Sequence, residues 1–358
     1  MAKAIAIDFV DEQFAKLEND VSYKASRNAV ADNDVLEIVK DRQVVQNMSH
    51  TFSNKVSKEG KCTSQKSSGR CWMFALCNVI RLGMMKKYNL PNDFELSQSF
   101  LFFYDKLERG NYFLNSIIET RDQPISSRIV AHLCTNPTED GGQFDMLVNI
   151  VQKYGICPKS VYGETKCCVA SRRMNQFLLN RLRTFASQLR ERSSSSSASV
   201  EELYAMKNKM MEEYHKILAI FFGRPPSSKK SFDFRFRDKD GKFQVFKNLT
   251  PLSFYEKFGK PAFDISSHIS LINDPRNEYY KLYTVQFLGN VVGGEKIRYL
   301  NIPIDELRAA VKKTIDQDLP VSCASYVVPI LDLRSTDSIS CAINSFTNTC
   351  GYYILLYI

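Results

Sequence analysis

The sequence predicts a mixed fold in which helices dominate and strands are confined to separate segments. Apolar residues recur three and four positions apart along much of the chain, which is the spacing of amphipathic helices. Phenylalanine alternates with polar residues in FDFRFRDKDGKFQVF, and the C-terminal end is rich in strand-forming residues. Of the 358 residues, 44% are hydrophobic and 24% are charged, as is typical of a soluble globular protein. This length allows two domains or one elaborated fold.

The residues up to about position 54 are expected to form helices. The segments DEQFAKLENDVSYK and NDVLEIVKDRQVVQ carry apolar residues at helical spacing, with Asn33 or Asp34 as the N-cap of the second. The polar stretch SNKVSKEGKCTSQKSSGR follows as a loop. From Cys71 to Tyr88 the apolar content is too high for a surface helix. We therefore expect a buried helix there, whose last turn carries Lys86 and Lys87 in favourable positions for the helix dipole.

The middle of the chain is also expected to be helical. A turn at residues 140–142, with the sequence DGG, precedes a helix from about Asp145 to Tyr154. Gly155 follows where a left-handed C-terminal residue is favoured. A long helical region then runs from Ala170 to about Phe222. It is interrupted by the low-complexity stretch SSSSSASV, which we interpret as a solvated loop.

Two strands and a last helix are expected before the chain changes in character. The alternation in FDFRFRDKDGKFQVF predicts a β-hairpin, because a DKDG turn separates its two halves. The turn lacks the further oxygen ligands and closing glutamate of a calcium loop, so no metal site is predicted. The segment IPIDELRAAVKKTI predicts a helix with Pro303 in its opening turn. Residues 322–358 contain no Lys, Glu or His, and their apolar end is expected to be buried in a sheet.

Composition also bears on the cellular compartment and on partners. Near the N-terminus, Asp8, Asp11 and Glu12 interrupt the apolar spacing, so the first 20 residues lack the uninterrupted apolar core of a signal peptide, and no run of ~18 apolar residues suggests a membrane span. We expect a cytoplasmic protein without membrane contact. Ten cysteines occur without CxxC or framework spacing, so they are expected to be thiols. The net charge of +9 is scattered and allows only weak binding of nucleic acid.

Cys71 is the strongest candidate for a chemical role. A cysteine attacks as its thiolate, which the N-terminus of a buried helix stabilises through the dipole and free backbone N–H groups. Gln65, six residues upstream across a flexible Ser-Ser-Gly turn, could add a side-chain N–H donor beside the backbone N–H of Cys71 to form an oxyanion hole. By position alone, Cys71 could equally be one more buried cysteine and Gln65 a surface amide.

A resemblance favours the chemical role. The segment QKSSGRCW is similar to the Gln…Cys-Trp active-site segment of papain-like cysteine peptidases, with Arg70 in place of the usual small residue. Together with LSQSFLFFYDKLER, NPTEDGGQFDMLVNIVQKYG, NDPRNEYYKLYTV and NVVGGEK, it resembles the bleomycin hydrolase and aminopeptidase C branch over roughly residues 30 to 321. Secreted relatives carry a disulfide cysteine where this sequence has Ser68, which fits an intracellular protein.

The resemblance implies an α+β, papain-like fold with the nucleophile at a helix N-terminus, a helical insertion and an incomplete right domain of β-barrel type. It implies that Gly141 and Gly142 bind the substrate backbone. It also implies a cytosolic thiol aminopeptidase without cofactor or metal, which acts on short peptides and on the amide of bleomycin and assembles as a homohexamer. The expected parts are an N-terminal helical arm (1–60), a left domain with the nucleophile (61–169), a helical insertion with the hairpin (170–260), the start of the right domain (261–321) and an anomalous C-terminal segment (322–358).

The base of a cysteine peptidase, a histidine oriented by an asparagine, is not found in this sequence. The four histidines are His50, His132, His215 and His268. His215 has a papain-like spacing from Cys71, but it falls within a helical pattern, whereas the papain-like base lies on a strand. We therefore expect the catalytic His and Asn to be absent and the chain as written to be inactive. The alternative is a non-catalytic nucleic-acid-binding or scaffold protein derived from the same family.

Overall fold

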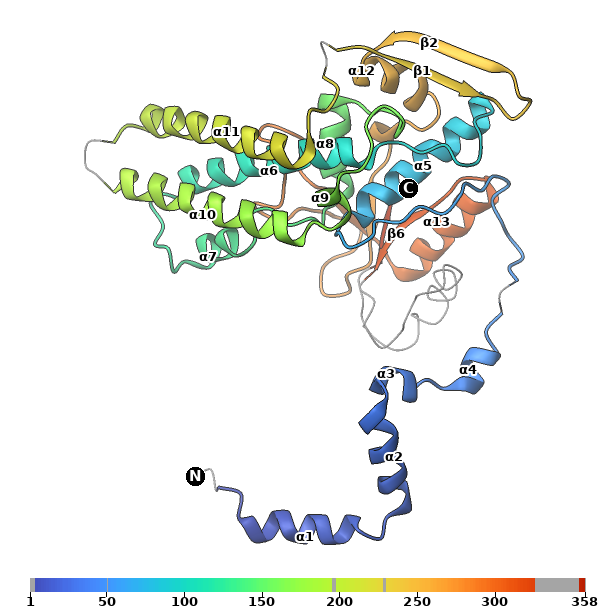
Figure 1. Ribbon diagram of the computed structural model, residues 1–358, viewed down its shortest axis with the longest axis vertical. Helices are drawn as coiled ribbons and strands as arrows, with labels where there is room; N and C mark the ends of the chain where they lie inside the picture. The colour runs from blue at the N-terminus through green and yellow to red at the C-terminus, as the bar shows by residue number, and fades with distance from the viewer. Residues whose placement is uncertain (1–3, 50, 195–197, 228–229, 326–353, 358) are drawn as a thin grey trace. The chain divides into compact units, whose positions relative to one another are not determined.

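The computed structural model describes residues 4–49, 51–194, 198–227, 230–325 and 354–357 (Figure 1). The chain divides into two compact units. One unit contains residues 1–53 and 326–352, and the other contains residues 54–325 and 353–358.

The N-terminal residues of the first unit form four helices, with sharper breaks than the sequence suggested. The helices are α1 (Ile7–Leu17), α2 (Val21–Asp32), α3 (Val35–Ile38) and α4 (Arg42–Gln46). The expected helix over residues 11–24 is wrong, because Asp20 accepts the backbone N–H of Tyr23 at 3.1 Å and begins a new helix. Asn33 ends α2 instead of capping the next helix. Asp41 divides the second expected helix by capping α4.

The second unit is built around α5 (Cys71–Tyr88), whose bounds agree with the buried helix expected from the sequence. Lys86 and Lys87 lie in its last turn, as predicted. It packs against α6 (Gln98–Glu119) and α8 (Phe144–Tyr154). Gly155 has the positive φ expected after α8, at +79°, but its ψ of −159° is not left-handed helical. The backbone of Pro251 lies 2.2 Å from where a Cβ of Gly155 would stand, so only glycine fits there.

A helical layer continues from α6 through the insertion. The antiparallel pair α10 (Arg172–Ser193) and α11 (Val200–Phe222) packs on α6 (Figure 1), which confirms a long helical region interrupted after Ser193. The short helices α7 (Arg128–Thr135) and α9 (Lys166–Val169) connect these longer ones.

The predicted hairpin is present as β1 (Phe232–Arg237) and β2 (Phe243–Leu249), paired antiparallel with a register shift between Phe232 and Phe234. It packs beside α12 (Pro251–Phe254) and the π-helical turn η1 (Tyr255–Gly259). Phe234 contacts the rings of Phe94, Phe254 and Phe258, with centroids 5.1–5.8 Å apart. The alternation of phenylalanine in the sequence therefore marks one buried aromatic face.

The second sheet has five short strands in the order β4-β5-β3-β7-β6. They are β3 (Ser270–Ile272), β4 (Leu282–Tyr283), β5 (Tyr299–Asn301), β6 (Ser322–Ser325) and β7 (Ile354–Tyr357). Only the pairing of β3 with β5 is parallel. Helix α13 (Ile304–Asp316) follows Pro303, and the turn η2 (Ile265–Ser267) precedes β3. The expected strand-forming end of the chain is seen in β6 and β7, whereas residues 326–353 lie outside the described residues.

The aromatic face of the hairpin gives a direct test of the fold. Phe234 is 3% exposed and Phe243, on the other strand, is 54% exposed. We expect Phe234→Ala to lower the free energy of unfolding by about 3–5 kcal/mol, because it leaves a cavity among three aromatic rings. Phe243→Ala is the matched control and should change it by less than about 0.5 kcal/mol. Chemical denaturation measures both; equal effects would contradict the assigned faces.

Candidate active site

Cys71 is the first residue of α5, at the point where the polar loop enters the core. Its side chain is exposed, whereas Arg70 before it and Trp72 after it are buried. The carbonyl of Arg70 accepts the backbone N–H groups of Met73 and Phe74, both at 3.0 Å, which fixes the first turn. The thiol is therefore presented to solvent at a helix N-terminus, where unpaired N–H groups favour an anion.

Arg70, which replaces the usual small residue of papain-like segments, is completely buried. Its guanidinium donates to both carboxylate oxygens of Glu164, at 3.2 and 2.9 Å. It also lies over the rings of Phe74 and Phe102, at 5.2 and 5.3 Å from their centroids. A buried charge needs such a partner. The ion pair therefore fixes Arg70, the residue before Cys71, to the segment between α8 and α9 that carries Glu164.

The turn that carries Gln65 is fastened to the same arginine. The Nε of Arg70 donates to the hydroxyl of Ser68 at 2.9 Å, and that hydroxyl donates to the carbonyl of Gln65 at 2.7 Å. The Oε1 of Gln65 is buried and makes no hydrogen bond with a described residue. The backbone of Gln65 is thus fixed in a turn six residues before Cys71, and its side-chain oxygen has no hydrogen-bond partner among the described residues.

The loop of residues 138–142 contacts Gly69 and Trp72, which flank Cys71 in the sequence. The indole Nε1 of Trp72 donates to the carbonyl of Asp140 at 2.7 Å, and the backbone N–H of Gly69 donates to the Asp140 carboxylate at 3.2 Å. A Cβ on Gly142 would stand 2.6 Å from the Trp72 ring. The structure therefore brings the two predicted glycines to the helix end that carries the thiol.

Gly141 and Gly142 differ in whether their backbone groups make hydrogen bonds with other described residues. The carbonyl of Gly141 accepts the guanidinium of Arg109 at 2.6 Å. No backbone hydrogen bond to another described residue engages Gly142. With respect to the described residues, the N–H and C=O of Gly142 are thus unpaired, and an extended peptide needs such groups to pair with a strand-like segment.

Asp140 is the centre of this loop. Its carboxylate accepts Ser171 at 2.5 Å, Asn175 at 2.7 Å and the Lys106 ammonium at 2.7 Å, besides Gly69. Burial by itself would raise the pKa of Asp140, but Lys106 and these hydrogen bonds outweigh it and hold the pKa below its ordinary value. Asp140 is therefore a buried anion whose charge is satisfied from several sides.

The histidines do not meet Cys71. His132 is exposed on α7. The Nδ1 of His268 lies 2.8 Å from the carbonyl of Asp264, and its ring lies 4.1 Å from that of Phe263. His50 lies outside the described residues. Among the histidines that the structure describes, none makes a hydrogen bond with the Cys71 sulfur.

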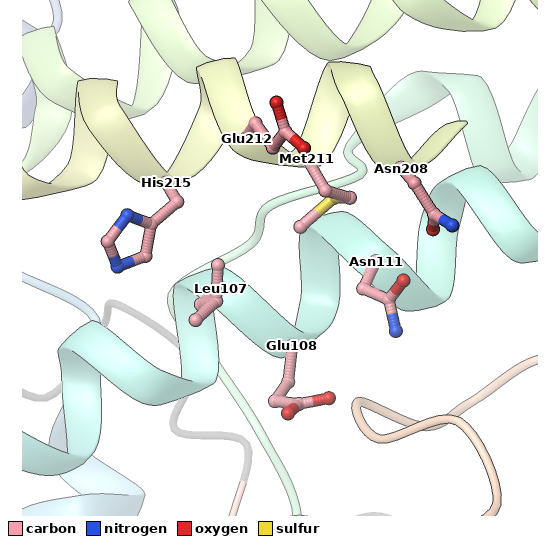
Figure 2. Close-up of a pocket in the computed structure, with 7 residues that line it drawn as sticks. All are labelled: Leu107, Glu108, Asn111, Asn208, Met211, Glu212 and His215. Atoms are coloured by element: carbon pink, nitrogen blue, oxygen red, sulfur yellow. The ribbon is translucent and has the colours of Figure 1, made fainter. Parts of the chain in front are cut away.

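His215 lies on α11 in a groove of about 480 Å³ between that helix and α6 (Figure 2). The other residues of the groove are Leu107, Glu108, Asn111, Asn208, Met211 and Glu212. Its ring makes an edge contact with Phe103 at 6.0 Å. Cys71 is not among the residues of this groove, as the helical pattern around His215 predicts.

The comparisons decide the family. Residues 4–335 match the Peptidase C1-like family. The chain belongs to this family. Its papain-like α+β fold is similar to the crystal structure of PepW from Lactobacillus rhamnosis. The two structures superpose with a TM-score of 0.85 and 37% sequence identity, and the match covers 93% of this chain and 73% of PepW. The resemblance and the fold class inferred from the sequence are thereby confirmed.

Curated relatives of this Peptidase C1-like chain include bleomycin hydrolase from Gallus gallus, 44% identical over 82% of this chain and 64% of the relative. Aminopeptidase C from Streptococcus thermophilus is 40% identical over 85% of this chain and 67% of the relative. A protein named cysteine proteinase 1, mitochondrial, from Saccharomyces cerevisiae is 36% identical over 94% and 69%. The chain spans 64% to 66% of the length of the bleomycin hydrolases from Gallus gallus and Homo sapiens.

Further structural findings concern the cysteines, the search for membrane-spanning helices and the residues that support the site. The seven cysteines whose side chains are described are free thiols, as predicted. Within the described residues, no helix combines the length and apolarity that a membrane crossing requires. Lys106, Arg109, Asp140 and Glu164, whose hydrogen bonds and ion pairs hold the glycine loop and Arg70, were not predicted as functional residues. The signal that could have revealed Lys106 and Arg109 is the cluster of four charged residues in YDKLER, which interrupts the apolar run SFLFF.

The two glycines of the loop provide a matched pair of variants. A Cβ on Gly142 would stand 2.6 Å from the Trp72 ring and 2.7 Å from Arg109, whereas one on Gly141 would meet only Glu139 at 3.8 Å or beyond. We expect Gly142→Ala to displace Trp72 and to change its fluorescence. Gly141→Ala should leave the spectrum unchanged. Because Trp72 is the only tryptophan, the emission spectrum reports this site alone. Identical spectra for both variants would contradict the placement of the loop.

Proposed function

We propose that this chain bears the nucleophile of a cysteine-type aminopeptidase, with Cys71 as the attacking residue. The observation that carries the proposal is the exposed thiol of Cys71 at the N-terminus of a buried helix, with the loop of Gly141 and Gly142 fastened on both sides of it. The relatives named bleomycin hydrolase and aminopeptidase C support peptide substrates and the amide of bleomycin.

The chemistry follows from these positions. The free N–H and C=O of Gly142 pair with the substrate backbone, and the thiolate of Cys71 attacks the carbonyl carbon of the scissile amide. The negative charge that develops on the carbonyl oxygen is stabilised by the backbone N–H of Cys71 and the side-chain amide of Gln65. The leaving amine must take up a proton, which in this class of enzyme is supplied by a histidine.

We propose further that the 358-residue chain, as written, hydrolyses amides slowly because that histidine is not paired with Cys71. None of the described histidines makes a hydrogen bond with the Cys71 sulfur, and His215 and His268 are engaged elsewhere. A positioned acid or base contributes about 10²–10⁴-fold to the rate. The thiol and the oxyanion donors would remain, so binding and alkylation of Cys71 should persist.

The test compares this chain with a chimera in which a relative's C-terminal portion replaces residues 322–358. We expect the chimera to hydrolyse aminoacyl substrates at least about 100-fold faster, because it restores the acid and base. Cys71→Ala should abolish the activity of the chimera, and Cys62→Ala, which removes another exposed thiol, is the matched control. Equal activity in both chains, lost with Cys71→Ala, would mean that another residue, such as His215, serves as the base.

Three finer points remain part of the proposal: a homohexamer, a cytoplasmic location and weak binding of nucleic acid.

The alternative function, a non-catalytic nucleic-acid-binding or scaffold protein, depends on the net charge of +9. If it is correct, affinity for single-stranded RNA should fall steeply with salt, because bound Lys and Arg release counterions. A filter-binding titration at about 50 and 200 mM salt measures this. No binding at the lower salt would exclude the alternative.

A further inference from the structure

Helix α6 carries charged side chains into the core behind the candidate active site. Asp105 and Lys106 are completely buried, and Arg109 is 9% exposed. Lys106 donates to the carbonyl of Thr138 and pairs with the Asp140 carboxylate at 2.7 Å. Because an ion buried away from water is strongly unfavourable without partners, a lysine at this position needs a specific reason.

Arg109 holds the other half of the same loop. Its NH2 donates to the carbonyl of Gly141 at 2.6 Å, and its Nε pairs with Asp105 at 2.8 Å. Its guanidinium also lies over the Trp72 ring, 5.5 Å from the centroid. Lys106 and Arg109, one helical turn apart on α6, therefore bind the loop at Asp140 and at Gly141.

The Asp140 carboxylate connects three segments that are distant in sequence. It accepts the backbone N–H of Gly69 before α5 and the side chains of Ser171 and Asn175 at the start of α10. An ionised carboxylate has two oxygens that can accept all of these donors, and its charge strengthens each hydrogen bond. A carboxylate is thus the right group to fasten the loop to the turn that precedes Cys71.

The same carboxylate creates an electrostatic conflict. A fixed negative charge beside the N-terminus of α5 opposes the formation of a second anion there, and burial increases this repulsion. Lys106 reaches the Oδ1 atom of this carboxylate from α6, at 2.7 Å, and supplies the missing positive charge. The carboxylate can then hold its donors without repelling a thiolate.

We propose that Lys106 and Asp140 form a positioning pair for the candidate nucleophile, in which Asp140 fastens the glycine loop to the turn before Cys71 and Lys106 cancels its charge. The inference rests on the proposed role of Cys71. We do not propose that Lys106 or Asp140 contacts the substrate, because both residues act through the glycine loop and the N-terminus of α5. The other charged groups around the pair are Asp105 and Arg109 of α6, and Arg70 with Glu164, and these form two ion pairs of their own.

The test uses the pH dependence of Cys71 alkylation by iodoacetamide in the full chain, followed by mass spectrometry of the peptide that contains Cys71. Alkylation requires the thiolate but no histidine and no substrate, so it can succeed even if the chain hydrolyses nothing. The variants are Lys106→Met, Asp140→Asn and the double variant. Lys153→Met is the matched control, because it removes another ion pair of α6, with buried Glu108 at 2.7 Å, away from the loop.

The single variants should move the midpoint of the alkylation profile in opposite directions. Lys106→Met leaves the carboxylate unbalanced and should raise the midpoint by about 0.5–1 pH unit, whereas Asp140→Asn leaves the ammonium unbalanced and should lower it by a similar amount. The double variant should return to within about 0.3 pH unit of the original chain, and Lys153→Met should not differ from it. Exposed Cys62, measured in the same samples, should be unaffected.

Two results would overturn the proposal. The first is a midpoint that is unchanged in both single variants while their thermal stability falls, which would make the pair structural only. The second is a shift of the same sign in both, which would mean that local disorder and not charge governs the thiol. If Lys106→Met fails to fold, Asp140→Asn and the double variant still decide the question, because they must differ by the predicted downward shift.

Discussion

The burial of α5 is the constraint on which the arrangement of this protein depends. Ten of its eighteen residues are buried, and they contact α6, α8 and the aromatic cluster under the hairpin. A helix surrounded in this way cannot leave its first N–H groups unsatisfied in an apolar environment. Its N-terminus must therefore reach a polar surface, and Cys71 stands where it does so. The exposure of the thiol and the burial of its neighbours are two results of the same packing.

Polar groups are placed around this helix end in a consistent way. On one side, the ion pair of Arg70 and Glu164 fixes the turn of Gln65 through Ser68. On the other side, Asp140 and Arg109 fix the glycine loop. The buried ions Arg70, Lys106 and Arg109 each have a carboxylate within 3 Å, as buried ions require. The site is thus held by charges inside the protein, whereas the backbone groups of Gly142 have no backbone partner in the part of the chain that the structure describes.

The success of sequence reasoning depended on how strongly local chemistry determines each element. The limits of α5 could be predicted because a polar loop changes abruptly into an apolar run at Cys71. Helix α6 was not predicted, since it is buried on nearly all sides and its charged residues face the core instead of solvent. The break before α2 was missed because a single cap at Asp20 outweighs the apolar spacing. Asp140 appeared only as part of a turn, because nothing local reveals contacts with residues 31 to 71 positions away.

The polar attachment of the turn before Cys71 has a consequence for the conditions in which the site keeps its shape. No disulfide joins the cysteines whose side chains are described, so a reducing agent has nothing to cleave there. Acid acts differently. The pKa of Asp140 is held below its ordinary value by Lys106 and its hydrogen bonds, although burial opposes this, so its contribution to stability is complete above about pH 4 and is lost as the pH falls through the folded-state pKa. Protonation would remove the ion pair with Lys106 and weaken the hydrogen bonds from Gly69, Ser171 and Asn175. The geometry around the thiol therefore depends on no disulfide among the described cysteines but is sensitive to strong acid.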